Sequence, residues 1–315
     1  MYNMIYIRNQ RDATIEDDTV LTLGKFDGLH RGHELLMENL FAVSRKTGLK
    51  TMVFTFDIPP NRKREEMDNR VLTTNEEKRE VFAKTGLDIL YECPFTTEIM
   101  TMEPKDFIQW IVTAFHVKVI VVGNDFRFGY QRKGTVETLR QFEKEYGYSL
   151  LVFDKVKEDG REISSTFIRE EIKEGRLKKA NHLLGYPFFV RSQVIHGKKL
   201  GRTIGIPTLN MDLPKEKLLP LNGVYVTRVT LLGQTYGAVT NVGCKPTVQA
   251  EGTVGVETHV IGFEGDVYGM EITVEFLDFI RTEKKFSSVE ELKTQMQKDV
   301  LYAKNQFSYY GNVTK

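Results

Sequence analysis

The chain has 315 residues, which is longer than one average domain and makes two domains the prior expectation. Its composition, 41% hydrophobic and 28% charged, is that of a globular protein, and its net charge of +1 argues against a nucleic-acid binder that works by bulk electrostatics. Cys93 and Cys244 form no Cys-x-x-Cys pair, so we expect neither a metal cluster nor a disulfide framework. Residues 1–18 have no long apolar core, and no apolar run has the length of a bilayer span, so we expect no signal peptide, no membrane association and a cytoplasmic location.

Strand and helix patterns alternate from residue 20 to about residue 184, which predicts a parallel sheet covered on both faces. We expect strands over 20–23, 50–56, 117–122 and 149–153, and helices over 34–46, 74–85, 104–116, 134–146 and 166–174. Ligands of such sheets bind at the carboxyl ends of the strands, and the motifs of this half fall at those ends.

The first motif, Gly24–His33, is a glycine-rich turn between the first strand and its helix. Its glycines allow a tight turn and a close approach of a ligand, and the helix start favours a phosphate. His30 and His33 are three residues apart and therefore share one face of the first turn, where two imidazoles suit a polyphosphate that gains charge as a bond breaks. The alternative is an ordinary turn with two surface histidines.

Two loops follow later strands. The loop after the second strand contains Pro59 and Pro60 and continues into a basic run, 61–66, that reads more readily as a solvated loop than as a phosphate site. After the buried strand 117–122, Asn124 and Asp125 either hydrogen-bond an adenosine or order their own loop as an Asx turn closed by glycine.

The stretch 163–169 precedes another helix, which either Ser165 or Thr166 is able to cap. Arg169 lies in or near the first turn, where the helix dipole disfavours a cation, so an anion facing it would explain its position. Pairing of Arg169 with a neighbouring glutamate is the alternative.

After residues 185–187 the strands become shorter and glycine more frequent, and helical periodicity disappears until residue 287. Runs over 188–194, 223–232, 234–241, 254–261 and 269–278 predict a small antiparallel barrel, and 287–306 predicts a closing helix with Ser287 or Ser288 as its cap.

The stretch 197–210 carries the chemistry of this half. Thr208 and Asn210 offer hard oxygen ligands that suit Mg²⁺ beside phosphates, and their spacing in an extended segment points them the same way. The stretch also has glycines for close backbone approach and cations for phosphate: Gly197, Lys199, Gly201, Arg202 and Gly205. The alternative is a basic hairpin loop.

In the strand 254–261, Val256, Thr258 and Val260 share one face and Glu257 belongs to the other. From the pattern alone, Glu257 is an exposed cross-strand carboxylate.

The Gly-x-Phe-Asp-Gly-x-His-x-Gly-His stretch resembles the signature of the nucleotidyltransferase superfamily, and 197–210 resembles the flavokinase signature Gly-x-x-x-Gly-Arg-x-x-Gly-x-Pro-Thr-x-Asn. Together with Ile163–Arg169, Gly123–Gly129, Asn222–Tyr225, 241–247 and 256–259, they resemble the prokaryotic bifunctional riboflavin kinase/FMN adenylyltransferase family. The family usually has a Pro-His-Pro type of sequence where this chain has Pro59-Pro60, so one phosphate contact is in doubt.

The resemblance implies a Rossmann-like adenylyltransferase domain over 1–184 and a riboflavin kinase barrel, closed by a helix, over 185–315. It implies catalytic roles for Glu257 as general base and for His30, His33 and Arg169. It implies Mg²⁺ at Thr208 and Asn210, and nucleotide or phosphate binding by Gly24, Phe26, Asp27, Asn124, Asp125, Ser165 and Thr166 as well as by the residues of 197–205 named above.

We therefore expect riboflavin, FMN and ATP as substrates, with FMN made in one domain and FAD in the other. One alternative keeps only one of the two activities. Another is a flavin-sensing binding module, which the neutral net charge disfavours if its partner is RNA. A third, another nucleotidyltransferase with a different acceptor, is disfavoured by the flavokinase signature.

Overall fold

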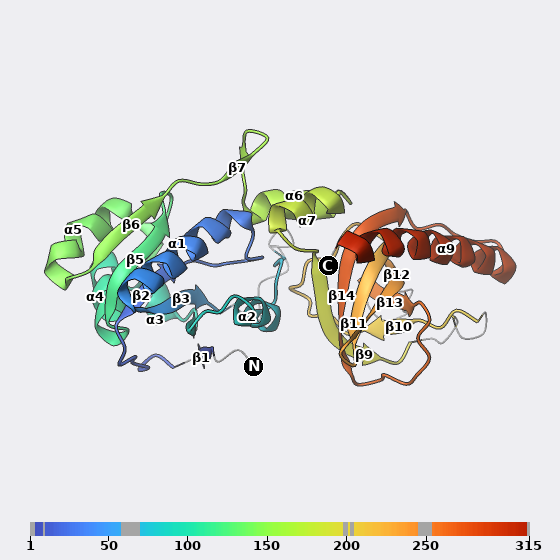
Figure 1. The fold of residues 1–315 in the computed structure, drawn as a ribbon, viewed down its shortest axis with the longest axis horizontal. Helices are drawn as coiled ribbons and strands as arrows, with labels where there is room; N and C mark the ends of the chain where they lie inside the picture. The colour runs from blue at the N-terminus through green and yellow to red at the C-terminus, as the bar shows by residue number, and fades with distance from the viewer. Residues whose placement is uncertain are drawn as a thin grey trace. The chain divides into compact units, whose positions relative to one another are not determined.

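The computed structural model describes residues 4–8, 10–57, 70–197, 201, 205–244 and 254–313. The chain divides into two compact units, 1–165 and 166–315, each with its own packed core (Figure 1).

The first unit is built on one six-stranded sheet with the order β1-β4-β3-β2-β5-β6, and every neighbouring pair is parallel. The strands are β1 (Ile5–Arg8), β2 (Thr19–Leu23), β3 (Lys50–Phe56), β4 (Ile89–Cys93), β5 (Val117–Gly123) and β6 (Ser149–Phe153). A two-stranded hairpin, β7 (Lys157–Glu158) and β8 (Arg161–Glu162), follows the sheet. The expected parallel sheet is confirmed.

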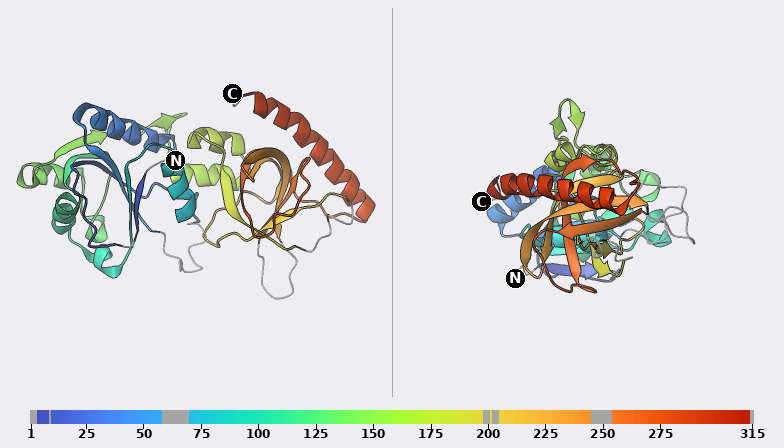
Figure 2. Two further views of the ribbon diagram at one scale, coloured as in Figure 1. Left: turned by 60° about the horizontal axis from the view of Figure 1, so that its bottom comes forward. Right: turned by 90° about the vertical axis from the view of Figure 1, so that its right-hand side faces the viewer.

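Helices cover both faces of this sheet, as Figure 2 shows. They are α1 (Arg31–Thr47), α2 (Asn75–Ala83), α3 (Thr97–Thr101), α4 (Pro104–Ala114) and α5 (Val136–Tyr146), with a short 3₁₀ turn, η2 (Tyr130–Arg132). Leu21 and Leu23 of β2 pack into one core cluster with residues of α3, α4 and α5, whereas Val20 packs into a second cluster with residues of α1 and α2. Alternate side chains of β2 therefore pack into the two core clusters on opposite faces of the sheet.

The second unit begins with α6 (Ser165–Lys173) and α7 (Leu177–Leu184), which precede a closed antiparallel barrel. The barrel order is β10-β13-β12-β11-β14-β9. Its strands are β9 (Phe189–Ile195), β10 (Leu209–Met211), β11 (Gly223–Leu231), β12 (Gln234–Cys244), β13 (Val254–Val260) and β14 (Glu271–Arg281). The long helix α9 (Val289–Val313) runs along the outside of the barrel (Figure 2), where Ala303 packs on Val226 and Leu277.

Most expected elements form, and the differences have local causes. The expected capping of α6 by Ser165 or Thr166 is wrong, because the helix already begins at Ser165. Arg169 is then the fifth helical residue and lies beyond the first turn. In contrast, Ser288 caps α9, since its hydroxyl accepts from the Glu291 N–H at 3.1 Å. The strands β1, β4, β7, β8 and β10 and the helices α3 and α7 were not expected.

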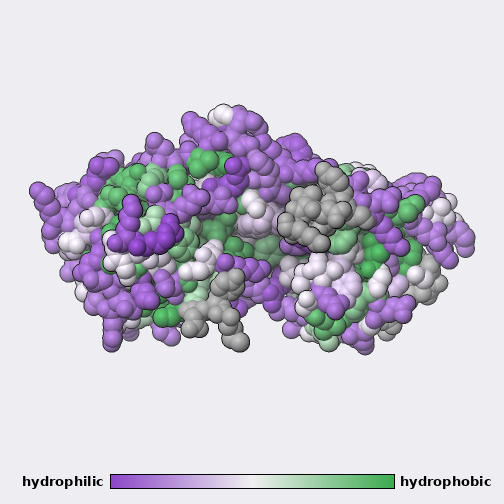
Figure 3. All heavy atoms as spheres, in the orientation of Figure 1, coloured by the Kyte–Doolittle hydropathy of each residue, from purple (hydrophilic) through white to green (hydrophobic). Residues whose placement is uncertain are grey.

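The visible face of the molecule is mostly hydrophilic, with separate hydrophobic areas (Figure 3). Within the described ranges, no helix combines the length and the apolar character that crossing a bilayer requires.

Candidate active sites

The Gly24–His33 turn leaves the carboxyl end of β2, which lies in the middle of the sheet between β3 and β5. The chain passes from β2 through α1 to β3 on one side, and β5 pairs with β2 on the other. This is the point where the strand order reverses, and α/β sheets bind their ligands there. The topology therefore places the first motif where a nucleotide site is expected.

Hydrogen bonds fix the conformation of the turn. The Asp27 carboxylate accepts from the backbone N–H groups of Leu72 and Thr73 at 2.7 and 3.1 Å. The Gly28 N–H, in a left-handed conformation with φ 75°, donates to the Thr73 hydroxyl at 3.1 Å. Asp27 thus holds the turn against the segment before α2, a role that the sequence did not assign to it.

The second motif of this half meets the first. The Ser165 hydroxyl donates to the Asp27 carbonyl at 2.9 Å, and a Cβ added at Gly32 would lie 2.9 Å from the Ile163 carbonyl oxygen. Gly32 therefore permits a close approach of the two segments. Asp27 and Ser165 are more than 130 positions apart in the sequence, and both lie near the start of α1.

The two histidines stack on one another. Their ring centroids are 3.7 Å apart, the planes differ by 19°, and the buried Phe26 ring lies 5.0 Å from the His33 ring. His30 is the residue before α1, and the described contacts give its side chain no cap hydrogen bond to that helix. Burial, and then the neighbouring His30, lowers the pKa of His33 well below the ordinary value. His33 is therefore neutral near pH 7, and its Nδ1 is buried with no hydrogen-bond partner among the described residues.

Polar side chains of the loop after β5 form hydrogen bonds and ion pairs with nearby residues. Asn124 donates to the Asp154 carboxylate at 2.7 Å, and Asp125 forms an ion pair with Lys155 at 2.8 Å. The Phe126 and Phe128 rings stack at 5.5 Å. The structure thus includes the contacts of the loop-ordering alternative, while both polar side chains stay exposed.

Thr166 and Arg169 follow Ser165 along α6, in the second compact unit. The neighbouring Glu171 is bound by Arg176 through two N–O contacts of 2.5 and 2.9 Å. Glu171, one of the neighbouring glutamates that the sequence offered as alternative partners for Arg169, is therefore paired with Arg176.

In the barrel, three polar residues lie side by side on adjacent strands. Asn210 of β10 and Asn241 of β12 are both register partners of Glu257 in β13. Directly opposed residues share a face and have Cβ atoms about 4.5–5.5 Å apart. The expected alternation of β13 is confirmed, because Val256, Thr258 and Val260 are buried. Asn241 was not assigned a role from the sequence.

A cavity of ≈ 300 Å³ lies near β10 and β13, at the segment that precedes Asn210 and at the end of the strand that carries Glu257. Its lining includes Pro207, Thr208, Val260 and the loop 263–268. The His259 Nδ1–H donates to the Pro207 carbonyl at 2.8 Å, which ties β13 to the segment that carries Thr208. Thr208 therefore lines the cavity and lies two residues before Asn210, the register partner of Glu257.

Comparisons with known proteins agree with this division of sites. The FAD synthetase family model matches residues 12–167, and the riboflavin kinase family model matches residues 184–307. The bifunctional riboflavin kinase/FMN adenylyltransferase of Listeria monocytogenes is 35% identical over 290 residues, which cover 91% of this chain and 92% of the relative. The enzyme of the same name from Escherichia coli K12 is 36% identical over 93% of this chain and 94% of the relative. The chain belongs to the bifunctional riboflavin kinase/FMN adenylyltransferase family.

A solved structure of a protein from Streptococcus pneumoniae, named as a macrolide-efflux protein, shares the fold. It is 32% identical to this chain and has a TM-score of 0.85. The match covers 96% of this chain and 99% of that protein. The name belongs to that protein, whereas this chain has a FAD synthetase domain and a riboflavin kinase domain.

The riboflavin kinase domain places Gly197 directly against Asn210. A Cβ added at Gly197 would lie 2.1 Å from the Asn210 side-chain nitrogen, and one at Gly201 would lie 2.3 Å from the Ile206 carbonyl oxygen. The glycines of this stretch therefore serve close approach, with Gly205 in the left-handed region at φ 77°. Lys199 and Arg202 lie outside the described residues, as do Pro59, Pro60 and the basic run 61–66.

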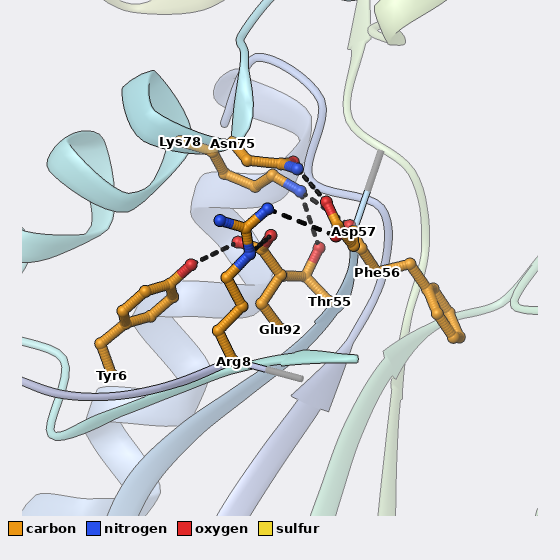
Figure 4. A network of polar contacts seen from close by, with 8 residues as sticks. All are labelled: Tyr6, Arg8, Thr55, Phe56, Asp57, Asn75, Lys78 and Glu92. Atoms are coloured by element: carbon orange, nitrogen blue, oxygen red, sulfur yellow. Dashed lines mark hydrogen bonds and ion pairs between the residues drawn. The ribbon is translucent and has the colours of Figure 1, made fainter. Parts of the chain in front are cut away.

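The FAD synthetase domain also contains a polar network that no motif indicated. Tyr6, Arg8, Thr55, Phe56, Asp57, Asn75, Lys78 and Glu92 converge at the carboxyl ends of β1, β3 and β4 (Figure 4). Its only local signal is Glu92 itself, a carboxylate inside the otherwise apolar strand Ile89–Cys93. A second unassigned feature is the edge-on pair of Phe56 and the exposed Phe95, whose rings lie 5.3 Å apart at the same sheet edge.

Proposed function

We propose that this chain phosphorylates riboflavin to FMN in its riboflavin kinase domain and adenylylates FMN to FAD in its FAD synthetase domain, with ATP as the second substrate of both reactions. The observation that carries the proposal is the presence of two unlike sites in one chain. A glycine turn with stacked histidines lies at the strand-order switch of the sheet. In the barrel, Asn210 is the register partner of Glu257, and Thr208 lines a cavity.

In the kinase step, Glu257 is proposed to take the proton of the terminal ribityl hydroxyl as that oxygen attacks the γ-phosphorus of ATP, and ADP leaves. The cavity beside Thr208 is proposed to hold the nucleoside of ATP. Support comes from its position, since Thr208 lines the cavity and Asn210 lies next to Glu257 in the register.

The donor set fits Mg²⁺ held jointly with phosphates. Thr208 and Asn210 supply neutral oxygens, and the described part of the chain contains no group of three or more His, Cys, Asp or Glu side chains that could hold a metal alone. When bound, Mg²⁺ would neutralise phosphate charge during transfer. The two side chains would orient it, and Gly197 leaves room for the Asn210 amide.

In the adenylyl step, an FMN phosphate oxygen attacks the α-phosphorus of ATP, and pyrophosphate leaves. The start of α1 and the neutral His33 are proposed to stabilise the triphosphate, because the free N–H groups of a helix N-terminus and the N–H of an imidazole donate hydrogen bonds to developing negative charge. Arg169 is proposed to contribute positive charge from α6.

One time course tests both activities and their rivals. The pure protein is incubated with riboflavin, ATP and Mg²⁺, and riboflavin, FMN and FAD are separated by chromatography. We expect FMN first and FAD second. FMN that accumulates without FAD would leave a kinase alone, and flavin binding without any product would indicate a sensing module. The His33→Ala variant is the internal check, since it should make FMN at the normal rate and lose FAD formation by about a hundredfold to a thousandfold.

The domain limits remain our proposal: 1–184 for adenylyl transfer and 185–315 for the kinase. The family matches end at 167 and begin at 184, whereas contacts group α6 and α7 with the barrel.

A further inference from the structure

Four charged side chains meet at the carboxyl edge of the sheet in the FAD synthetase domain (Figure 4). Arg8 ends β1, Asp57 directly follows β3, Glu92 lies near the end of β4, and Lys78 reaches in from α2. Glu92 is 0% exposed and Lys78 is 2% exposed. Buried charges cost free energy unless they are paired and hydrogen-bonded, so Glu92 and Lys78 need partners in the fold.

The cluster is neutral within itself. Glu92 accepts a hydrogen bond from the Tyr6 hydroxyl at 3.1 Å and lies 3.5 Å from the Arg8 guanidinium, which also contacts Asp57 at 3.4 Å. Burial raises the pKa of Glu92, and the nearby Lys78 ammonium acts against that rise. Two cations balance two carboxylates, so the cluster has no surplus charge with which to recruit a phosphate.

The hydrogen bonds of Lys78 point elsewhere. Its ammonium donates to the Phe56 carbonyl at 3.0 Å and to the Thr55 hydroxyl at 3.3 Å. The fully buried Thr55 hydroxyl donates in turn to the Lys25 carbonyl at 3.1 Å. Lys25 is the second residue of the glycine turn, so a chain of hydrogen bonds joins α2 through the end of β3 to that turn.

A second set of hydrogen bonds joins the start of α2 to the same turn. The segment before it binds the turn through the Asp27 carboxylate and the Gly28 N–H. The capping box of Thr74 and Glu77 fixes where α2 begins. Both ends of the Lys25–Gly28 segment are therefore attached to α2 or to the residues that precede it.

We infer that Lys78 and Thr55 are positioning residues for adenylyl transfer, which set the place of the Gly24–His33 turn and hence of its stacked histidines. The inference rests on the proposed function of this domain. This role requires no contact between either residue and a substrate. The carboxylates around Lys78 stabilise its buried ammonium.

The main test compares two threonines of the same strand. Thr55→Val removes the link to the turn without changing charge or size. Thr51→Val removes a buried hydroxyl that donates to Asp88 at 2.7 Å and accepts from its N–H at 2.9 Å, at the opposite end of β3. In the full chain, Thr55→Val should lower kcat for FAD formation from supplied FMN about tenfold with little change in KM, since misplacement by about 1 Å costs up to about a hundredfold. Thr51→Val should lower the melting temperature and keep kcat.

A second comparison separates positioning from charge balance. Lys78→Met leaves Glu92 without its ammonium and should reduce both stability and kcat for adenylyl transfer. The double variant Lys78→Met with Glu92→Gln removes one charge of each sign. It should recover the melting temperature while kcat stays low, and Lys78→Arg should recover part of kcat. FMN formation from riboflavin, measured in the same chain, should be unchanged throughout.

The inference is overturned if Thr55→Val forms FAD at the wild-type rate, if Thr51→Val slows FAD formation as much as Thr55→Val, or if the double variant regains full kcat. If Lys78→Met does not fold, the threonine pair still decides. A wild-type chain that makes no FAD would instead contradict the proposed function.

Discussion

Replacing Gly197 with alanine should disable the kinase through Asn210. The new Cβ would lie 2.1 Å from the Asn210 side-chain nitrogen and 2.6 Å from its Cγ, whereas real Cβ contacts essentially never fall below 3.0 Å. The amide must therefore move by about 0.9 Å, the difference between 3.0 and 2.1 Å. Asn210 is 6% exposed and lies in a strand paired on both sides, so the movement has little free space.

A shift of this size in a proposed Mg²⁺ ligand should reduce kcat for FMN formation about a hundredfold, which corresponds to about 2.7 kcal/mol. The assay follows FMN from riboflavin and, separately, FAD from supplied FMN, which should keep its rate. Asn210→Ala should give a similar loss. Because both changes act on one group, the double variant should be no slower than the slower single variant.

Gly233→Ala is the matched control in the same barrel. Gly233 has φ 74° and no atom within 4 Å of an added Cβ, so alanine there is strained without touching a neighbour. It should cost about 1 kcal/mol of stability and leave the kinase intact. If Gly197→Ala retains wild-type kcat, or if its loss adds fully to that of Asn210→Ala, the proposed role of Asn210 is wrong.

Four further outcomes are expected. Glu257→Gln should lower FMN formation about a hundredfold to ten-thousandfold, because the amide cannot take a proton, and added Mg²⁺ should not restore it. Thr208→Ala should regain part of its activity at high Mg²⁺, and equal responses of the two variants to metal would contradict the division between base and ligand. Burial lowers the pKa of His33, so the unfolded chain binds that proton more tightly, and the free energy of unfolding should fall as pH drops below 6.5. Urea melts at pH 7.5 and 5.5 should show a smaller fall in His33→Asn. A fragment from Thr166 should melt higher than one from Leu184, since Asn181 of α7 donates to the Phe276 carbonyl of β14 at 2.8 Å and accepts from the Phe188 N–H at 2.7 Å.

Hydrophobic patterning located the central strands of the sheet but missed β4, although β4 is as long as β6 and fully buried. The limits of β3 and β6 agree with the sequence-based expectation. β10 was missed because three residues are too short for a periodic signal, and it exists only because both neighbouring strands pair with it. The same pairing brings Asn210 beside Glu257, a proximity that spacing along the chain cannot give.

The sequence predicted which segments come together better than it predicted the contacts of each residue. The glycine turn and Ser165 do meet, as two separate motifs at one sheet edge require. Asp27, which the family resemblance places at the nucleotide, accepts two backbone N–H groups with one carboxylate oxygen, and nothing in the sequence indicated these contacts. The motif predicts that a carboxylate is required at this position, but only the structure shows which N–H donors that carboxylate accepts hydrogen bonds from.

Lys78 illustrates why some positions are invisible before the fold is known. In the sequence it belongs to a run of six charged or polar residues in seven, Asn75–Val81, which predicts a solvated helix face. Its burial becomes favourable only because Thr55, Phe56 and Glu92 arrive from two strands that flank α2 in the chain. The free energy of a buried ammonium is set by those partners, since an unpaired one would be strongly destabilising. Local composition therefore predicts the opposite environment from the observed one, and the disagreement itself marks Lys78 and Thr55 as the residues to test first.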